Sequence, residues 1–184
     1  LYRQFSALPL KKYNVTADEL FKVKRYFLVF LQSMSMHFKA PVLKNRDEYM
    51  ADNVALIADH HGAEARIIVS ADNDHVTKSN GRMGYALMSR YGKNYLNIGF
   101  TYSKGTYVAD GPKGFYPVHE PHLGTYEYFL EQCRYKHFFL DLRKANGIES
   151  LNRRSGFRLI GSRPQEVMQF AEMDIRKVFD LLIY

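Results

Sequence analysis

The chain has 184 residues, of which 46% are apolar and 24% charged, and it carries a net charge of +7. This balance excludes a disordered chain, and the length fits one domain or a large part of one. No stretch reaches the roughly 18 to 20 uninterrupted apolar residues of a membrane span, and a single cysteine excludes an internal disulfide.

The first two predicted elements are helices. The segment Thr16-Ala17-Asp18-Glu19 matches a capping box, and apolar residues then recur at three- and four-residue steps as far as about Met36. A second helix is predicted from about Arg46 to His60, with Asn45 as its cap and Gly62 just past its end. We interpret the first helix as packing material.

A strand, a helix and a second strand are predicted next. Residues Arg66 to Ser70 form a short segment rich in β-branched residues, as expected for a strand in the middle of a parallel sheet. A helix follows from about Arg82 to Tyr91, with Gly92 just past its end, and Tyr95 to Tyr102 has the composition of the next strand. Such a unit is expected to have a right-handed crossover.

The second half of the chain is predicted to contain a long loop and shorter elements. Residues Gly105 to Gly124 have no usable period, which favours a lid or binding loop near the carboxyl end of a strand. Thr125 is predicted to cap a short helix that runs through Cys133. We interpret Cys133 as a core residue of that helix and not as a catalytic nucleophile. His137 to Asp141 is predicted to be a third strand. Two short apolar runs, Phe157 to Ile160 and Leu181 to Tyr184, are predicted as peripheral strands around a helix that Pro164 initiates.

Basic residues concentrate in the last third of the chain. Nucleic-acid binding is one interpretation, because 14 tyrosines and 13 phenylalanines could stack on bases. No recognisable binding signature accompanies the charges, so a solvated basic face or attraction for an anionic substrate is the favoured interpretation. The residues are Arg134, Lys136, Arg143, Lys144, Arg153, Arg154, Arg158 and Arg163.

The candidate chemistry lies just after the first predicted strand. Asp72, Asn73, Asp74 and His75 follow its carboxyl end, which is the edge where α/β sheets build their sites. An imidazole beside carboxylates can transfer protons at neutral pH, so His75 is the candidate acid or base. Asp72, Asn73 and Asp74 are candidate substrate-binding residues around it. The alternative is a histidine that satisfies the backbone groups of a turn.

Two residues of the preceding helix, Arg46 and Asp47, are candidate substrate contacts. They have an equally good interpretation as a structural ion pair that never touches ligand.

A metal site is the weaker alternative for this chemistry. Asp72, Asp74 and His75 could be ligands, and the segment His119-Glu120-Pro121-His122 offers further groups. The proline interrupts the helical geometry that a zinc-protease motif needs, so we expect no metal. The sequence also lacks the glycine-rich motifs of serine hydrolases, nucleotide hydrolases and dinucleotide-binding proteins, so an activated water is the expected nucleophile of a hydrolase.

The order and spacing of several motifs resemble the erythromycin esterase family. The motifs are Arg46-Asp47-x-x-Met50-Ala51-x-Asn53, Ala71-Asp72-Asn73-Asp74-His75-Val76, Met83-Gly84-x-x-Leu87, Tyr91-Gly92-x-x-Tyr95-x-x-Ile98-Gly99-Phe100, Phe139-Leu140-Asp141-Leu142-Arg143 and Phe179-Asp180-x-Leu182-Ile183-Tyr184. The resemblance covers residues 45–184, as the C-terminal half of such a protein, with residues 1–44 as a helical lead-in. It implies an α/β fold of three αβα layers with a mostly parallel sheet.

The resemblance also implies a reaction. Members of the family hydrolyse esters, in the best-known cases the macrolactone of erythromycin-type antibiotics, with a histidine that activates water. Some relatives are labelled as polysaccharide biosynthesis proteins, including succinoglycan biosynthesis. We therefore expect a hydrolase of a small-molecule ester or lactone, cytoplasmic, with no cofactor and with neither nucleic acid nor membrane as partner.

Two departures from the family pattern weaken this expectation. The family usually has His-Asn-x-His after the strand, whereas Asp72 replaces the first imidazole here. The family's principal base lies in a Gly-Glu-x-x-His segment that this chain lacks. The chain would then supply only part of a site, and the alternative is a non-catalytic ligand-binding or scaffold domain with the same fold.

Overall fold

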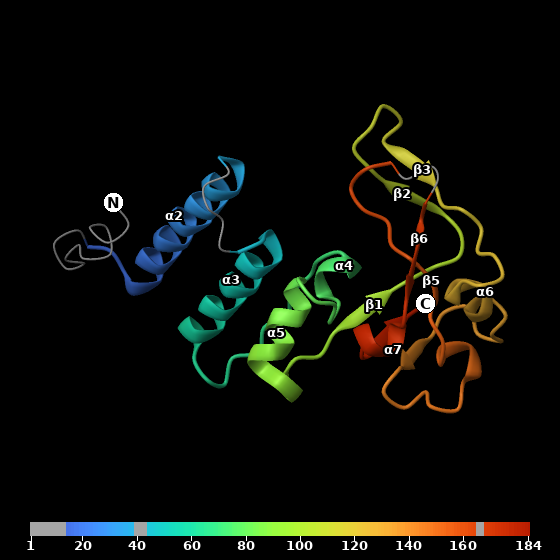
Figure 1. Ribbon diagram of the computed structural model, residues 1–184. Coiled ribbons are helices and arrows are strands. Elements are labelled where there is room, and N and C mark those ends of the chain that lie inside the picture. Colours follow the sequence, from blue (N-terminus) through green and yellow to red (C-terminus); the bar gives the residue numbers. More distant parts are fainter. Residues whose placement is uncertain (1–13, 39–43, 165–167) are drawn as a thin grey trace. The chain divides into compact units, whose positions relative to one another are not determined.

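The computed structural model describes residues 14–38, 44–164 and 168–184 (Figure 1). The chain divides into two compact units, Leu1–Tyr49 and Met50–Tyr184, and the division falls inside helix α3. None of the helices in the described parts has the length and apolar composition needed to cross a membrane.

The first unit contains helix α2 (Ala17–His37) and the start of α3 (Arg46–His61). The predicted capping box of α2 is confirmed, because Thr16 and Glu19 exchange side-chain and backbone hydrogen bonds. At α3, the Asn45 side chain accepts from the Glu48 N–H at 2.9 Å, and the Glu48 carboxylate accepts from the Asn45 N–H at 2.7 Å. These reciprocal bonds satisfy donors that a helix start leaves open.

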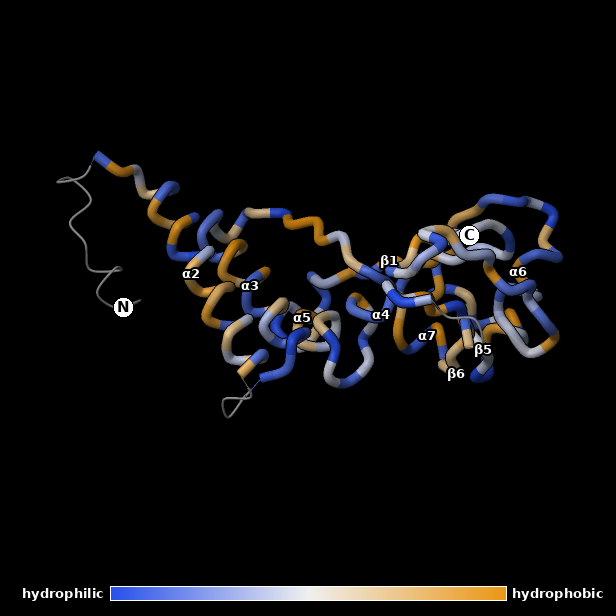
Figure 2. The backbone as a smooth tube through the Cα atoms, turned by 90° about the horizontal axis from the view of Figure 1, so that it is seen from above, coloured by the Kyte–Doolittle hydropathy of each residue, from blue (hydrophilic) through white to orange (hydrophobic). Residues whose placement is uncertain are grey.

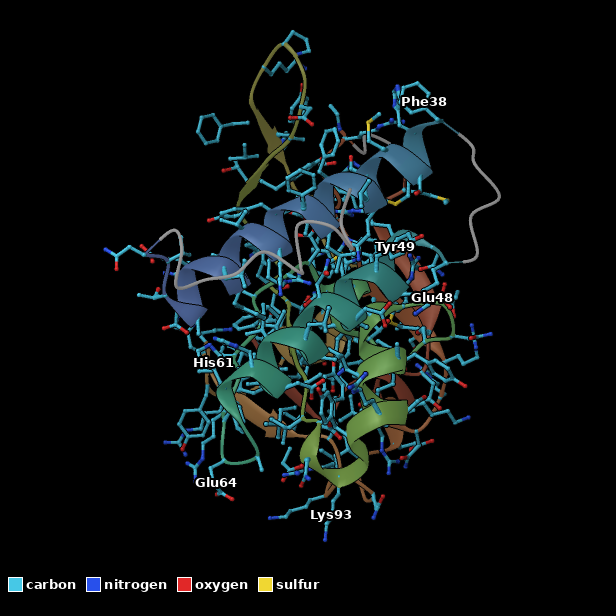
Figure 3. All side chains as sticks on the ribbon, turned by 90° about the vertical axis from the view of Figure 1, so that its left-hand side faces the viewer. Phe38, Glu48, Tyr49, His61, Glu64 and Lys93 are labelled. Atoms are coloured by element: carbon cyan, nitrogen blue, oxygen red, sulfur yellow. The ribbon has the colours of Figure 1, made fainter. Side chains whose placement is uncertain are left out.

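Helix α3 crosses into the second unit and ends as predicted. Gly62 follows it with a φ of 92°, and its N–H donates to the Ala58 carbonyl at 3.0 Å. Glycine enters this left-handed region without the steric cost of a Cβ. Figure 3 shows Glu48 and Tyr49 near one end of α3, and His61 at the other end.

The second unit has a central sheet with strand order β1-β7-β4. Strands β1 (Ile98–Phe100) and β7 (Leu181–Ile183) are parallel, while β4 (Phe139–Asp141) pairs with β7 in the antiparallel sense. Gly99 of β1 lets the Phe179 ring pack against the strand, since a Cβ there would lie 3.1 Å from the ring.

Two further pairs of strands complete the described sheets. Strands β2 (Thr106–Val108) and β3 (Phe115–Pro117) form one antiparallel pair, and β5 (Ser155–Arg158) and β6 (Phe170–Met173) form another. The prediction of a mostly parallel sheet is therefore not confirmed, because of the pairings between strands only β1 with β7 is parallel in the described residues.

Short helices connect these strands and pack on them. They are α4 (Asn73–Val76), α5 (Met83–Tyr91), α6 (Tyr126–Glu131) and α7 (Ile175–Val178), with single 3₁₀ turns η2 (Gly92–Asn94) and η3 (Glu149–Leu151). The largest core cluster of the unit joins α6, β5, α7 and β7. Its buried members are Tyr126, Leu130, Leu142, Ala145, Leu151, Phe157, Ile175, Phe179 and Leu182.

The structure corrects two strand and loop predictions. Residues 66–70 were expected as an inner strand, but they pair with no strand in the described structure. The expected lid at 105–124 contains the β2–β3 hairpin instead, with Tyr107 and Tyr116 buried against each other at 5.8 Å between ring centroids. Each of these strands has only three residues, so its alternation is too short to stand out in the sequence.

One further prediction in the second half is wrong, and another falls partly outside the described residues. Cys133 is exposed beyond the end of α6, not buried in a core helix, because the helix ends at Glu131. The helix expected from Pro164 falls partly on residues 165–167, outside the described residues, and beyond them the chain forms strand β6. The predicted strands near 139–141, 157–160 and 181–184 are confirmed as β4, β5 and β7, within a few residues.

Candidate functional site

The candidate residues Asp72 to His75 form a short helical turn beside strand β1. Asp72 stands at the N-cap of α4, and its carbonyl accepts from the His75 N–H at 3.0 Å. The Asn73 amide donates to the Phe100 carbonyl at 2.5 Å, and the Asn73 side-chain oxygen accepts from the Phe100 N–H at 2.9 Å. Asn73 thereby fixes α4 to the last residue of β1.

Further contacts hold the same turn in place. The Asp74 carboxylate forms an ion pair with the Arg82 guanidinium at 2.7 Å, with each side chain 40% exposed. The buried Thr77 hydroxyl donates to the Asp74 carbonyl at 2.9 Å. His75 is half-buried within this turn, while Asp72 is exposed. A carboxylate, an imidazole and an amide therefore lie within four consecutive residues of a well-anchored turn.

Helix α5 packs unusually closely against the end of this turn. A Cβ at Gly84 would lie 2.2 Å from the Val76 carbonyl oxygen and 2.4 Å from that of Thr77. Only a glycine at this position lets the start of α5 lie directly against the end of α4. Buried Met83 and Leu87 of α5 then pack with Ala51 of α3 in a second core cluster.

The other two predicted contacts belong to the first unit. Arg46 is exposed and Asp47 is 6% exposed, both in the first turn of α3. Because His75 belongs to the second unit, the prediction that these side chains line one pocket with it stays a prediction.

The alternative metal segment, His119 to His122, is held in place by backbone hydrogen bonds of His119 and by a ring contact of His122. The His119 N–H donates to the Gln169 side chain at 2.7 Å, and the His119 carbonyl accepts from Arg158 at 2.7 Å. The His122 ring packs edge-on against Phe170, at 5.4 Å between centroids. In the described parts of the chain, no group of three or more His, Cys, Asp or Glu residues could hold a metal ion.

A buried polar cluster, which sequence reasoning missed, lies just beyond the carboxyl end of β1. The Glu127 carboxylate accepts from the Thr101 hydroxyl at 2.5 Å and from the Arg158 N–H at 2.9 Å, both through Oε1. Glu127 is fully buried, and its second oxygen, Oε2, has no hydrogen-bond partner among the described residues. Burial raises the pKa of Glu127, against the opposing effect of the hydrogen bonds from Thr101 and Arg158.

Arg158 connects this cluster to the surrounding loops. Its guanidinium donates to the Tyr102 carbonyl at 2.9 Å and to the Gln169 side chain at 2.9 Å, and it lies 4.6 Å from the centroid of the Phe170 ring. Burial lowers the pKa of Arg158, and the negative charge of Glu127 opposes this. A signal was available in the sequence, since Arg158 is a charge inside the apolar run from Phe157 to Ile160.

A second buried polar cluster was also missed, at the amino ends of β1 and β7. The Asn97 amide donates to the carbonyls of Val76 and Val178 at 2.7 and 2.8 Å, and Asn97 and Asp180 exchange two further bonds. The Lys78 ammonium lies 2.5 Å from the Asp180 carboxylate. The signal in the sequence was a polar residue, Asn97 or Asp180, directly before each of the two apolar strands. The cluster fixes the segment after α4 to the sheet.

The arrangement provides a rigid mount for one titratable imidazole. Asn73 and Asp74, which precede His75, bind Phe100 and Arg82. Val76 and Thr77, which follow it, are held by bonds to Asn97 and to the Asp74 carbonyl. An imidazole with neighbouring carboxylates can accept a proton from water and return it to a leaving group.

Comparisons with known proteins agree with this fold. The sequence model of the erythromycin esterase family matches residues 2–184. A crystal structure of a Bacillus cereus protein is similar, with 26% sequence identity and a TM-score of 0.66, over 74% of this chain and 36% of that one. A crystal structure of a succinoglycan biosynthesis protein is similar over 99% of this chain and 54% of that one, with 20% identity and a TM-score of 0.67. No curated protein matches the chain.

Proposed function

The chain belongs to the erythromycin esterase family, and from this membership we propose that it takes part in the hydrolysis of a carboxylic ester or lactone. The chain spans 36% and 54% of the two solved proteins, and we propose that it contributes part of the hydrolytic site. We also propose that the complete fold has the three αβα layers that the sequence predicts.

The observation that carries the proposal is the mounting of His75. The turn that bears it is fixed at both ends, by the two Asn73 bonds to Phe100 and by the Asn97 bond to Val76. Proton transfer needs a group held within hydrogen-bond reach of the reacting atoms, so a rigid mount favours a chemical role over a loose surface histidine.

In the proposed reaction, a water molecule attacks the carbonyl carbon of the ester. His75 accepts a proton from that water, or returns one to the alkoxide as the bond between the carbonyl carbon and the alkoxy oxygen breaks. The products are a carboxylic acid and an alcohol, so the two hydrogens of water are accounted for. Asp72 and Asp74 shape the pocket around the imidazole, and Asn73 keeps the turn on β1.

Arg46 and Asp47, in the first turn of α3, are proposed as further substrate contacts. A guanidinium beside a carbonyl oxygen stabilises the negative charge that develops there during hydrolysis. Asp47 would orient that guanidinium or the substrate from the next position of the same helix turn.

The test measures hydrolysis of macrolactone and simple ester substrates by the complete protein that contains this chain. We expect His75→Ala to lower kcat by about 100-fold or more, the usual contribution of a positioned acid or base. His61→Ala is the matched control, because His61 is exposed at the end of α3 and should leave kcat unchanged. Equal turnover in the two variants would remove His75 from the mechanism.

A second candidate function is supported by Asp72. An acid stands where the family usually has an imidazole, and it is exposed at the N-cap of α4 without a side-chain capping bond. A ligand-binding or scaffold domain of the same fold would keep affinity for a lactone and lack turnover. Lactone binding measured by calorimetry, together with absent hydrolysis by the complete protein, would identify this second function.

A further inference from the structure

The sequence contains two asparagine–glycine pairs, Asn80-Gly81 and Asn146-Gly147, which lie in different surroundings of the second unit. An asparagine followed by glycine readily loses its side-chain amide, because glycine has no Cβ to keep its backbone nitrogen away from the asparagine Cγ. Asparagine is therefore counted among the thermolabile residues. Since the two pairs are chemically identical, a difference in their reactivity must come from the fold.

The first pair lies in the turn that joins α4 to α5, a stretch drawn in blue and white in Figure 2. The Arg82 N–H donates to the Ser79 carbonyl at 3.1 Å, which places Asn80 and Gly81 at the two central positions of the turn. The φ of Gly81 is 78°, a conformation that glycine adopts without steric cost. The Asn80 side chain is exposed and forms no hydrogen bond with the described residues. Its amide can therefore rotate without breaking a contact of that kind.

The second pair is held by hydrogen bonds. The Arg176 guanidinium donates to Oδ1 of Asn146, and the Asn152 amide donates to the Asn146 carbonyl at 3.1 Å. Arg176 also donates to the Asn152 side chain, so one guanidinium fixes both asparagines. Arg176 belongs to α7, where its neighbour Ile175 is fully buried in the largest core cluster. Rotation of the Asn146 side chain must therefore break a contact to a well-anchored helix.

We propose that Asn80 is a site of spontaneous deamidation in the folded protein, and that the fold protects Asn146 from the same reaction. The backbone nitrogen of Gly81 attacks the Cγ of Asn80 and forms a five-membered succinimide ring. The bond between Cγ and the amide nitrogen breaks, and the proton that the Gly81 nitrogen loses leaves with that amide nitrogen as ammonia. Water then opens the ring at one of its two carbonyl groups, which gives aspartate or isoaspartate at position 80.

The reaction changes the connection between α4 and α5. It places a new carboxylate two residues before Arg82, which forms an ion pair with Asp74 at 2.7 Å. Isoaspartate also adds one carbon to the main chain of the turn. Helix α5 lies directly against the end of α4, since a Cβ at Gly84 would be 2.2 Å from the Val76 carbonyl oxygen. A longer connection therefore loosens this packing, and the effect on stability does not depend on the proposed activity.

The test is peptide mass spectrometry after the protein has been kept warm in mildly alkaline buffer. In the folded protein, Asn80 is expected to deamidate at least about tenfold faster than Asn146, the effect of about one hydrogen bond that must open first. In denaturant the two pairs should react at similar rates, because the fold no longer distinguishes them. Asn80→Gln is the control, since its longer side chain would need a six-membered ring and should keep its amide.

Arg176→Ala tests the protection of Asn146 directly. Loss of the guanidinium releases Oδ1 of Asn146, so deamidation there is expected to become about tenfold faster while the rate at Asn80 stays unchanged. If Arg176→Ala proves too unstable to fold, Asn152→Ala gives the same comparison. That variant removes the bond to the Asn146 carbonyl and leaves the guanidinium in place.

Thermal unfolding measures the consequence for the packing of α5. After the same warm incubation, the wild type is expected to have a Tm about 2 °C or more below that of Asn80→Gln, because only the wild type acquires isoaspartate in the turn. Equal rates at Asn80 and Asn146 in the folded protein, or a faster reaction at Asn146, would overturn the proposed site. A deamidated wild type with an unchanged Tm would overturn the predicted loosening.

Discussion

At the scale of single residues, Glu127 is the buried group on which most of the polar contacts near the end of β1 depend. Its Oε1 accepts from the Thr101 hydroxyl and the Arg158 N–H, and both of those donors are themselves buried. The cost of removing such an acceptor is set by the donors left behind, at about 1 to 3 kcal/mol for each buried donor.

We predict that Glu127→Ala lowers the free energy of unfolding by about 2 to 6 kcal/mol, because two buried donors lose their acceptor. Glu127→Gln keeps an oxygen in the Oε1 position and should cost less. The measurement is chemical denaturation, with Glu149→Gln as control, since the exposed Glu149 should change stability by less than about 0.5 kcal/mol. A Glu127→Ala protein as stable as this control would contradict the role of the carboxylate.

The same residue gives a pH dependence with a defined sign. Burial raises the pKa of Glu127 in the folded chain, above the value of about 4.3 expected in the unfolded chain. The folded state therefore binds this proton more tightly than the unfolded chain does. The stabilisation that the bound proton provides is full below about pH 4 and is lost as pH rises through the pKa of the folded state. Glu127→Gln does not titrate, so its stability relative to the wild type should increase with pH over this window.

At the scale of elements, the packing of α5 on α4 depends on one missing side chain. Alanine normally stabilises a helix interior by about 1 kcal/mol relative to glycine. At Gly84, however, a Cβ would lie 2.2 Å from the Val76 carbonyl oxygen, and backbone atoms cannot move aside cheaply. The steric effect must therefore outweigh the helix propensity.

We predict that Gly84→Ala lowers the free energy of unfolding by about 2 kcal/mol or more and displaces the turn that carries His75. Gly147→Ala is the control, because nothing lies within 4 Å of a Cβ there, and it should be neutral or slightly stabilising. Thermal unfolding of both variants measures the two changes in stability. A Gly84→Ala protein more stable than the wild type would show that α5 shifts freely on α4.

The elements that the sequence predicts well are those with long periodic signals. Helix α2 and its capping box, α3 with Gly62 after it, and α5 with Gly92 after it were all predicted within a few residues. The β2–β3 hairpin was missed because three-residue strands have almost no period. Residues 66–70 have strong β propensity, but propensity without a partner strand does not make a sheet.

At the scale of the whole molecule, the sequence predicts the polar residues Asp72 to His75 at the carboxyl end of a strand. In the structure they form a helical turn beside β1, and the segment before them is not a strand. The sequence did not reveal that Asn73 bonds to Phe100, or that Glu127 and Arg158 meet across 31 positions of sequence. Such long-range polar contacts depend on the complete packing, which no local pattern encodes.

The last third of the chain carries many of the basic residues that give the molecule its positive charge. Several of the basic residues in the last third are engaged within the fold. Arg158 is buried, Arg143 binds Asp141 with 2.8 Å between Nε and Oδ1, and Arg154 donates to the Glu172 carbonyl at 2.9 Å. Hydrogen bonding from Arg143 holds the pKa of Asp141 at about 2, so that carboxylate stays charged at neutral pH.

We therefore predict only weak, sequence-independent binding to oligonucleotides, despite the net charge of +7. Fluorescence anisotropy with a single-stranded 20-mer at physiological salt should give a Kd in the non-specific range, about 10⁻⁴ to 10⁻⁶ M. Raising the salt should abolish this binding, because it comes only from released counterions. A Kd near 10⁻⁸ M, with preference for one sequence, would instead mean that the basic residues form a dedicated nucleic-acid surface.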